Sequence, residues 1–251
     1  MLGFAVALAV LACASYSDLK TREVSDLVWI FGYPLGSALT LIEVSAGRLA
    51  ITPFLVSTCL SAVAAALLFR FGLFGGADAL ALTFLGLAVP AYPEGLPLLG
   101  DAFMPPAFVA LGNAVILSLA CPIAVFTLNA LDLLRGRNPF RGVEADFWEL
   151  IALMFTARRV SLERLTRGLH YFPAERLVER GGRLVRVPVC FMRAEGDFSA
   201  VTKSMVEHGE IYADGALASP TLPMIAFLTM GLALALVGNL ALQLVRLLTG
   251  F

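Results

Sequence analysis

The sequence predicts an all-α polytopic membrane protein, with six transmembrane helices and a small cytoplasmic α+β domain before the last helix. Hydrophobic residues make up 59% of the 251 residues and charged residues only 15%, whereas about a quarter of the residues of a soluble domain are charged. The apolar residues also gather into six runs, most of them close to the ~20 residues that cross a bilayer. This composition excludes a large soluble enzyme and predicts the lipid bilayer as a partner.

We expect the six spans at residues 1–17, 27–42, 49–69, 79–91, 107–134 and 220–248. The first run has the length of a cleaved signal peptide, but no basic residues precede it. Asp18, Lys20 and Arg22 follow it, which favours a retained helix. The fourth run is short, so we expect its ends to lie in protein rather than in lipid. A proline-rich connection at 93–106 follows it.

The charges predict how these spans are oriented. The net charge of −1 speaks against a nucleic-acid partner, which usually meets a basic surplus. If the N-terminus lies outside, sixteen of the eighteen Lys and Arg residues fall on the inner side, as the positive-inside rule requires. We therefore predict membrane helices in 1–134, a cytoplasmic domain in 135–219 and a last membrane helix in 220–251.

Two local patterns stand out in the predicted cytoplasmic domain. Asp146 and Glu149 have capping-box spacing at the start of an amphipathic helix that reaches to about residue 159. Its apolar face suits either the inner membrane surface or the core of a small globular domain. Further on, residues 176–180 and 183–187 flank Gly181-Gly182, which predicts a β-hairpin.

Metal-binding patterns are absent from the sequence. It has four cysteines without a Cys-x-x-Cys pair and two histidines far apart, so we predict no metal site and no cofactor. Acids beside apolar runs are better candidates for chemistry, because charges near lipid are costly. Four acids have this position: Asp18, Asp26, Asp78 and Asp132.

Asp18 and Asp78 are the strongest pair among these acids. The chain crosses the membrane twice between them, so both return to the inner face. Two carboxyl groups that share one proton supply a general base to activate water and a general acid to protonate a leaving amine. This is the chemistry of aspartic peptide hydrolysis.

The stretch before Asp78 is rich in glycine. Gly75, Gly76 and Ala77 precede the acid, and glycines let the backbone approach a substrate chain closely. A flexible turn with an N-cap aspartate accounts for the same residues. Taken alone, this stretch favours the turn.

Three segments carry a family resemblance. Residues 18–30 read DLKTREVSDLVWI, residues 75–78 read GGAD, and Pro220-x-x-Pro223 opens the last run. With the six spans, they resemble the archaeal preflagellin and type IV prepilin peptidases, which are membrane-embedded aspartic proteases with a Gly-x-Gly-Asp motif. The resemblance covers nearly the whole chain, and the first two motifs are its specific part.

The resemblance implies a cofactor-free endopeptidase with Asp18 and Asp78 as its catalytic pair. The implied substrates are precursors of archaellins or type IV pilin-like proteins, with a basic leader before a hydrophobic helix, cut at the cytoplasmic face. Charge complementarity suggests Glu23, Asp26 and Asp132 as leader contacts.

Two departures from the family pattern are visible. Ala77 stands at the second motif glycine, where a positive φ would be unfavourable for alanine, and the lysine often found after the motif aspartate is missing. The zinc-binding cysteine cluster of bacterial relatives is also absent, which implies peptidase activity without their methyltransferase activity.

Two other classes of function fit parts of the sequence. A small transporter or channel would use its acids to relay protons or bind a cation, but it predicts acids in the middle of spans. Asp18 and Asp78 lie at span ends, and the central thirds of the six runs contain no acid. A membrane scaffold explains the polar domain but leaves both aspartates without a role.

Overall fold

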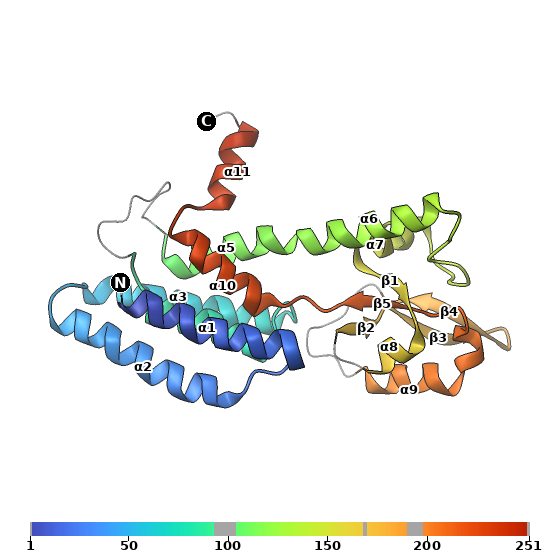
Figure 1. Ribbon diagram of the computed structural model, residues 1–251, viewed down its shortest axis with the longest axis horizontal. Helices are drawn as coiled ribbons and strands as arrows, with labels where there is room; N and C mark the ends of the chain where they lie inside the picture. The colour runs from blue at the N-terminus through green and yellow to red at the C-terminus, as the bar shows by residue number, and fades with distance from the viewer. Residues whose placement is uncertain (1, 93–103, 168–169, 190–197, 250–251) are drawn as a thin grey trace. The chain divides into compact units, whose positions relative to one another are not determined.

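The computed structural model describes residues 2–92, 104–167, 170–189 and 198–249, so most of the predicted proline-rich connection lies outside the described residues. The chain divides into two compact units (Figure 1). Unit 1 comprises Met1–Ser118 and Pro223–Phe251, and unit 2 comprises Leu119–Leu222. Each unit has a hydrophobic core of its own.

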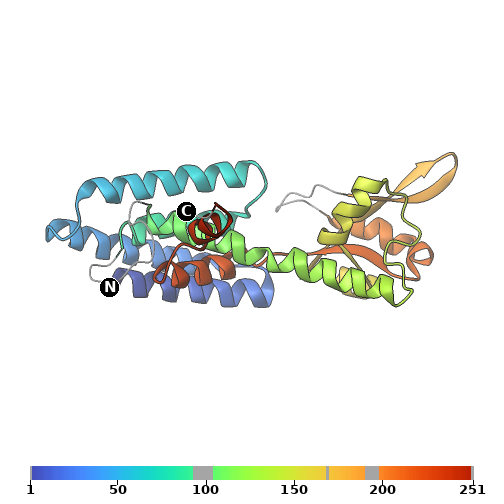
Figure 2. The ribbon, with the colours of Figure 1, turned by 90° about the horizontal axis from the view of Figure 1, so that it is seen from above.

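Unit 1 consists of helices, and the axes of most of them are roughly aligned with one another in both ribbon views (Figures 1 and 2). They are α1 (Leu2–Thr21), α2 (Asp26–Ser45), α3 (Ile51–Arg70), α4 (Gly76–Ala88), α5 (Pro106–Ser118), α10 (Met224–Ala235) and α11 (Leu240–Thr249). Helix α4 is central, because it contacts α1, α2, α3, α5 and α10. Its side chains Leu82, Phe84 and Leu85 are fully buried in the core.

The described helices give four candidate membrane spans, or five if α10 and α11 form one bent span. The four are α1, α2, α3 and the 29-residue apolar stretch Pro106–Leu134. The predicted count of six is therefore not confirmed. Helix α4 has only 13 residues, about 20 Å of helix, which is less than the ~30 Å of hydrocarbon.

The predicted last span is broken rather than continuous. Helices α10 and α11 meet at an angle of 72°, and the buried side chain of Asn113 on α5 supplies the hydrogen bonds that the break leaves unmade. Its amide donates to the carbonyls of Gly231 (3.2 Å) and Gly238 (3.1 Å), and its Oδ1 accepts from the Leu240 N–H at 2.8 Å. Broken helices are tolerated at membrane depth when a neighbour satisfies the freed backbone groups in this way.

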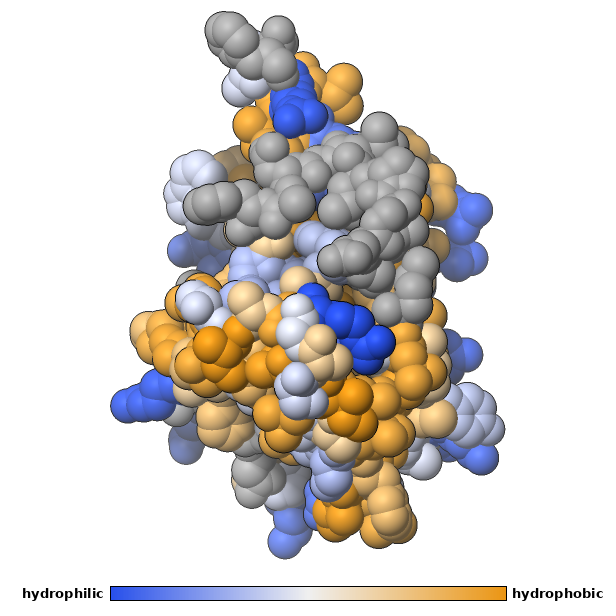
Figure 3. All heavy atoms as spheres, turned by 90° about the vertical axis from the view of Figure 1, so that its left-hand side faces the viewer, coloured by the Kyte–Doolittle hydropathy of each residue, from blue (hydrophilic) through white to orange (hydrophobic). Residues whose placement is uncertain are grey.

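The surface of unit 1 is apolar. Hydrophobic residues cover much of the face in Figure 3, and large side chains such as Phe31 on α2, Leu60 on α3 and Leu67 on α3 are exposed. A soluble protein rarely exposes apolar patches of this extent. Together with the candidate spans, this surface supports a location in a membrane.

Unit 2 mixes helices and strands. It contains α6 (Ala120–Leu134), α7 (Phe147–Thr156), β1 (Arg158–Val160), α8 (Leu162–Thr166), β2 (Tyr171–Pro173), β3 (Glu175–Arg180), β4 (Arg183–Pro188), α9 (Ser199–Glu207), a 3₁₀ turn (Gly209–Tyr212) and β5 (Ala216–Pro220). An antiparallel sheet has the order β1-β5-β2, and β3 pairs with β4. Helix α6 belongs to this unit by its contacts, because α7 packs on it, and it also forms the end of the candidate span Pro106–Leu134.

The capping box and the hairpin predicted for this region are confirmed, but α7 ends at Thr156, and Arg158 and Arg159 lie in β1 rather than at the helix end. Asp146 accepts from the Glu149 N–H at 2.7 Å, and Glu149 accepts from the Asp146 N–H at 2.9 Å, so the capping box opens α7. Strands β3 and β4 form the predicted hairpin. Gly181 and Gly182 have φ values of 59° and 75° at its turn, which is the conformation of a type I′ turn.

A buried ion pair joins the hairpin to β5. Glu175 is 0% exposed and Arg186 is 4% exposed, and two hydrogen bonds of 2.7 and 2.9 Å link them. Glu175 also accepts from the Leu217 N–H at 2.6 Å, and Arg186 donates to Asp214 at 3.1 Å. The pair is buried with its hydrogen-bonding capacity in use, which is how buried charges are tolerated.

Candidate active site

Asp18 and Asp78 lie at the ends of two helices that pack against each other. Asp18 is in the last turn of α1, and Asp78 is the third residue of α4. Both side chains are partly buried. The carboxylate of Asp18 acts electrostatically on that of Asp78, so residues sixty apart in sequence share one electrostatic environment.

The N-terminus of α4 fixes the Asp78 side chain. Gly75 is the N-cap residue, and its N–H donates to Oδ2 of Asp78 at 3.1 Å. The negative charge also lies in the first turn, where the helix dipole favours it. This contact fits the capping alternative for the glycine-rich stretch, although Asp78 is at the N3 position rather than at the N-cap. One carboxylate oxygen thus has a structural role in orienting the group.

The rest of α4 is anchored by its neighbours. The Tyr33 hydroxyl of α2 donates to the Leu80 carbonyl at 2.9 Å, and Thr40 of α2 donates to the Leu87 carbonyl at 3.1 Å. The rings of Trp29, Tyr33 and Phe84 pack edge to face beside these bonds. A rigid element therefore carries Asp78.

Arg22 lies beside the candidate pair, although it was not predicted from the sequence as a site residue. The guanidinium of Arg22 lies 3.7 Å from the Asp18 carboxylate. The backbone N–H of Arg22 donates to the backbone carbonyl of Asp18 at 3.0 Å. Its φ is +58°, the one positive value for a non-glycine residue in the part of the chain that the structure describes. A left-handed conformation costs such a residue roughly 1–2 kcal/mol. The four-residue spacing of opposite charges at a helix end was the available sequence signal.

Arg22 also acts electrostatically on Asp78. The loop that follows it is held to the end of α1, because Ser17 and Thr21 both donate side-chain hydrogen bonds to the Glu23 carbonyl, at 2.8 and 3.0 Å. The site therefore contains two carboxyl groups and one guanidinium. Such a cluster can hold a proton on one carboxyl group while the other is ionised.

Ala77 does not need a positive φ. It lies inside the first turn of α4, after Gly75 (φ −77°) and Gly76. The left-handed glycine of this segment is Gly72, at φ +72°. Alanine in place of the second motif glycine is thus compatible with the backbone observed here.

The three proposed leader contacts fall in different places. Glu23 and Asp26 are exposed in the loop after α1 and at the start of α2, a few residues from Asp18. Asp132 is partly buried on α6 and belongs to unit 2. The structure therefore brings only the first two into the same unit as the aspartate pair.

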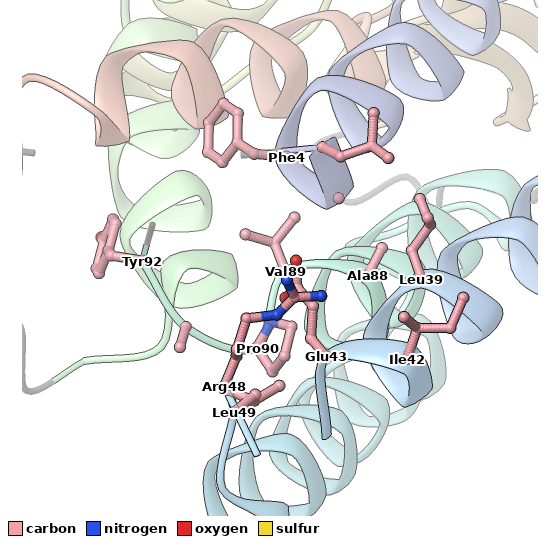
Figure 4. A pocket seen from close by; sticks show the side chains of 13 residues that line it. Phe4, Leu39, Ile42, Glu43, Arg48, Leu49, Ala88, Val89, Pro90 and Tyr92 are labelled. Carbon is pink, nitrogen blue, oxygen red and sulfur yellow. The ribbon is translucent and has the colours of Figure 1, made fainter. Parts of the chain in front are cut away.

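The cavity in Figure 4 is not part of this site. It has a volume of about 620 Å³ and lies at the start of α1 and the end of α2, where Phe4, Glu43 and Arg48 line it. Asp18 follows Phe4 by fourteen residues of helix α1, about 21 Å. Among the described residues, no group of three or more His, Cys, Asp and Glu side chains could hold a metal ion.

Residues 5–131 match the type IV leader peptidase family. The chain is also 31% identical over 181 residues to the preflagellin peptidase of Methanocaldococcus jannaschii. The aligned region covers 68% of this chain and 74% of that protein. The family match includes Asp18, Asp78 and the stretch Gly75–Ala77. It ends shortly before the close of α6, so most of unit 2 lies outside it.

Proposed function

The chain belongs to the type IV leader peptidase family, and we propose that Asp18 and Asp78 are the catalytic pair with which it cuts its substrates. The observation that carries this proposal is that α1 and α4 pack against each other and that each has a partly buried carboxyl group in a terminal turn, Asp18 and Asp78. A protease of this kind needs no cofactor, because both proton transfers use side chains.

The two carboxyl groups divide the chemistry between them. The ionised one removes a proton from water, whose oxygen attacks the carbonyl carbon of the scissile peptide bond. The protonated one gives its proton to the departing nitrogen as the C–N bond breaks, so that the pair again holds one proton. Arg22 lies beside the pair and offsets part of its negative charge.

The substrates are precursors of archaellins or type IV pilin-like proteins. The relative's name makes preflagellin its substrate, and a precursor with a basic leader before a hydrophobic helix suits a site at the end of membrane helices. The leader's positive charges would meet Glu23 and Asp26, which are exposed beside the pair, and Asp132 is a third candidate contact. Such charges steer and orient a partner more than they add affinity.

The orientation completes the proposal. The N-terminus lies outside, the aspartate pair lies at the cytoplasmic face, and residues 135–219 are cytoplasmic. The distribution of Lys and Arg supports this arrangement. It puts the water needed for hydrolysis within reach of the pair.

Cleavage of a precursor pilin in membranes tests the catalytic pair. Asp18→Asn and Asp78→Asn each remove one ionisable group with little change of shape, and we expect each to lower the rate by about 10²–10⁴-fold. Glu43→Gln is a matched control, because it neutralises an acid at the opposite end of unit 1. Parent-like cleavage by either aspartate variant, at matched expression, would contradict the proposal.

A further inference from the structure

Helix α7 in unit 2 has one buried side and one exposed aromatic side. Leu153 is fully buried, and Leu150 and Met154 pack against the same core cluster. Phe147 and Trp148 are 69% and 74% exposed, and their rings contact each other with centroids 5.5 Å apart. Of the two predicted alternatives for this helix, the core face is confirmed, and the aromatic side is left exposed.

Helix α7 is fastened to the side of α6. The buried side chain of Asn129 donates to the carbonyls of Met154 (3.1 Å) and Ala157 (2.7 Å), and the rings of Phe126 and Phe155 stack at 4.7 Å. Phe126 precedes the end of α6 by eight residues, about 12 Å of helix. The end of α7 therefore lies beside α6 well before α6 ends.

The length of the apolar helix sets the depth of this contact. The stretch Pro106–Leu134 has 29 residues, about 43 Å, whereas the hydrocarbon is ~30 Å thick and the bilayer with its headgroup regions ~40–45 Å. The last turns of α6 therefore fit the headgroup region. Their exposed side chains are still apolar, with Leu128, Leu131 and Leu134 among them, as lipid contact requires.

The two cavities beside α7 differ in the acids that line them. A groove of about 590 Å³ runs along its apolar side, and Leu133, Phe147 and Ile151 line it together with Arg141. The acids at the start of α7, Asp146 and Glu149, line a different cavity and serve in the capping box. The apolar groove is thus bordered by an arginine and by none of these acids.

We propose that the exposed aromatic side of α7, formed by Phe147 and Trp148, docks on the anionic phospholipid surface of the bilayer that α6 enters. Phe147 and Trp148 lie in the interface, where amphipathic aromatic side chains are favoured. The groove takes apolar lipid atoms, and the exposed guanidinium of Arg141 binds a headgroup phosphate. Helix α7 packs beside the end of α6, whose exposed side chains are apolar. This position points to lipid rather than to another protein as the partner.

The two tryptophans of the chain allow a direct test. Trp29→Phe leaves Trp148 as the only tryptophan, and Trp148→Phe leaves Trp29, which is buried in the core of unit 1. The full-length protein is placed in nanodiscs, one chain per disc, made of phosphatidylcholine and phosphatidylglycerol with brominated acyl chains. We expect bromine near the headgroup to quench Trp148 at least twofold more than bromine deep in the chains, and aqueous iodide to quench it weakly.

The buried Trp29 sets the baseline, because it should respond little to either quencher. Full quenching of Trp148 by iodide without quenching by brominated lipid would overturn the docking. Quenching that appears only with two chains per disc would instead show contact with a second copy, and would also overturn it.

The arginine is tested separately in the same discs. Arg141→Gln should lower the quenching of Trp148 in discs with phosphatidylglycerol to the value in phosphatidylcholine alone. Arg183→Gln is the matched control, since Arg183 is equally exposed but lies beside the hairpin turn. Equal quenching in the Arg141→Gln and parent proteins would overturn the assignment of an anionic headgroup.

Discussion

Each unit of this protein contains an acid paired with an arginine, and the two pairs differ in almost every respect. Glu175 and Arg186 in unit 2 are buried and joined by two hydrogen bonds of 2.7 and 2.9 Å. Asp18 and Arg22 in unit 1 are partly exposed and 3.7 Å apart, and Arg22 adopts a left-handed backbone conformation. Asp18 also has a second acid, Asp78, within its electrostatic reach.

The difference teaches how to tell a structural charge pair from a reactive one. A buried carboxylate that accepts three hydrogen bonds, as Glu175 does, holds neighbouring strands together and contributes to the fold. A carboxylate with a loose partner, a like charge nearby and access to water can exchange a proton. We therefore expect substitutions in the two pairs to separate stability from activity.

The largest effect on stability should come from Glu175→Gln. The substitution leaves the buried Arg186 without its main counter-charge, and breaking a buried pair in this way costs roughly 3–5 kcal/mol. Denaturant unfolding of the detergent-solubilised protein measures the change. Glu179→Gln is the control, because Glu179 is an exposed acid on the same strand. Equal unfolding midpoints for the two variants would show that the buried pair contributes little to the free energy of unfolding.

The next effect concerns activity. Arg22→Gln removes the positive charge beside the aspartate pair, and we expect precursor cleavage to fall about tenfold, which corresponds to about 1.4 kcal/mol. Arg22→Lys should restore most of the rate, since it restores the charge. Arg48→Gln, at the other end of unit 1, should cleave like the parent. A parent-like rate for Arg22→Gln would remove Arg22 from the site.

A smaller effect should move stability and activity in opposite directions. Arg22→Gly permits the φ of +58° without strain, so the free energy of unfolding should rise by up to ~1 kcal/mol. The rate of cleavage should still fall as in Arg22→Gln. Parallel measurements of unfolding and cleavage test this, and a loss of both would mean that the arginine is chiefly structural.

The smallest effect is expected at Ala77. Its helical conformation makes Ala77→Gly tolerable, with a stability cost below ~1 kcal/mol and cleavage within about threefold of the parent, including a mild gain. The same unfolding and cleavage assays apply. Complete loss of cleavage would mean that this turn is more than a permissive start to α4.

Features that depend on neighbouring residues were predictable from the sequence. The capping box of Asp146 and Glu149 and the turn of Gly181-Gly182 are written within a few positions, and both are confirmed. The candidate pair of Asp18 and Asp78 followed from where apolar runs end, together with the family resemblance. Their assignment as catalytic residues stays a prediction until the variants are measured.

Features that depend on distant partners were not predictable. The break between α10 and α11 relies on Asn113, more than a hundred residues earlier in the chain. The burial of Glu175 and Arg186 emerges only when β3, β4 and β5 come together. The count of six spans is not confirmed for a similar reason, because hydropathy does not report that neighbouring helices surround the short α4.

The role of Asn113 has a consequence for how the protein is made. Without α5, the polar backbone groups at Gly238 and Leu240 would enter lipid unpaired, at a cost of several kcal/mol each. With α5 in place, Asn113 receives them. Helices α10 and α11 should therefore integrate into the membrane only after α5 or together with it. The insertion of the C-terminal helices thus depends on a helix that is synthesised much earlier.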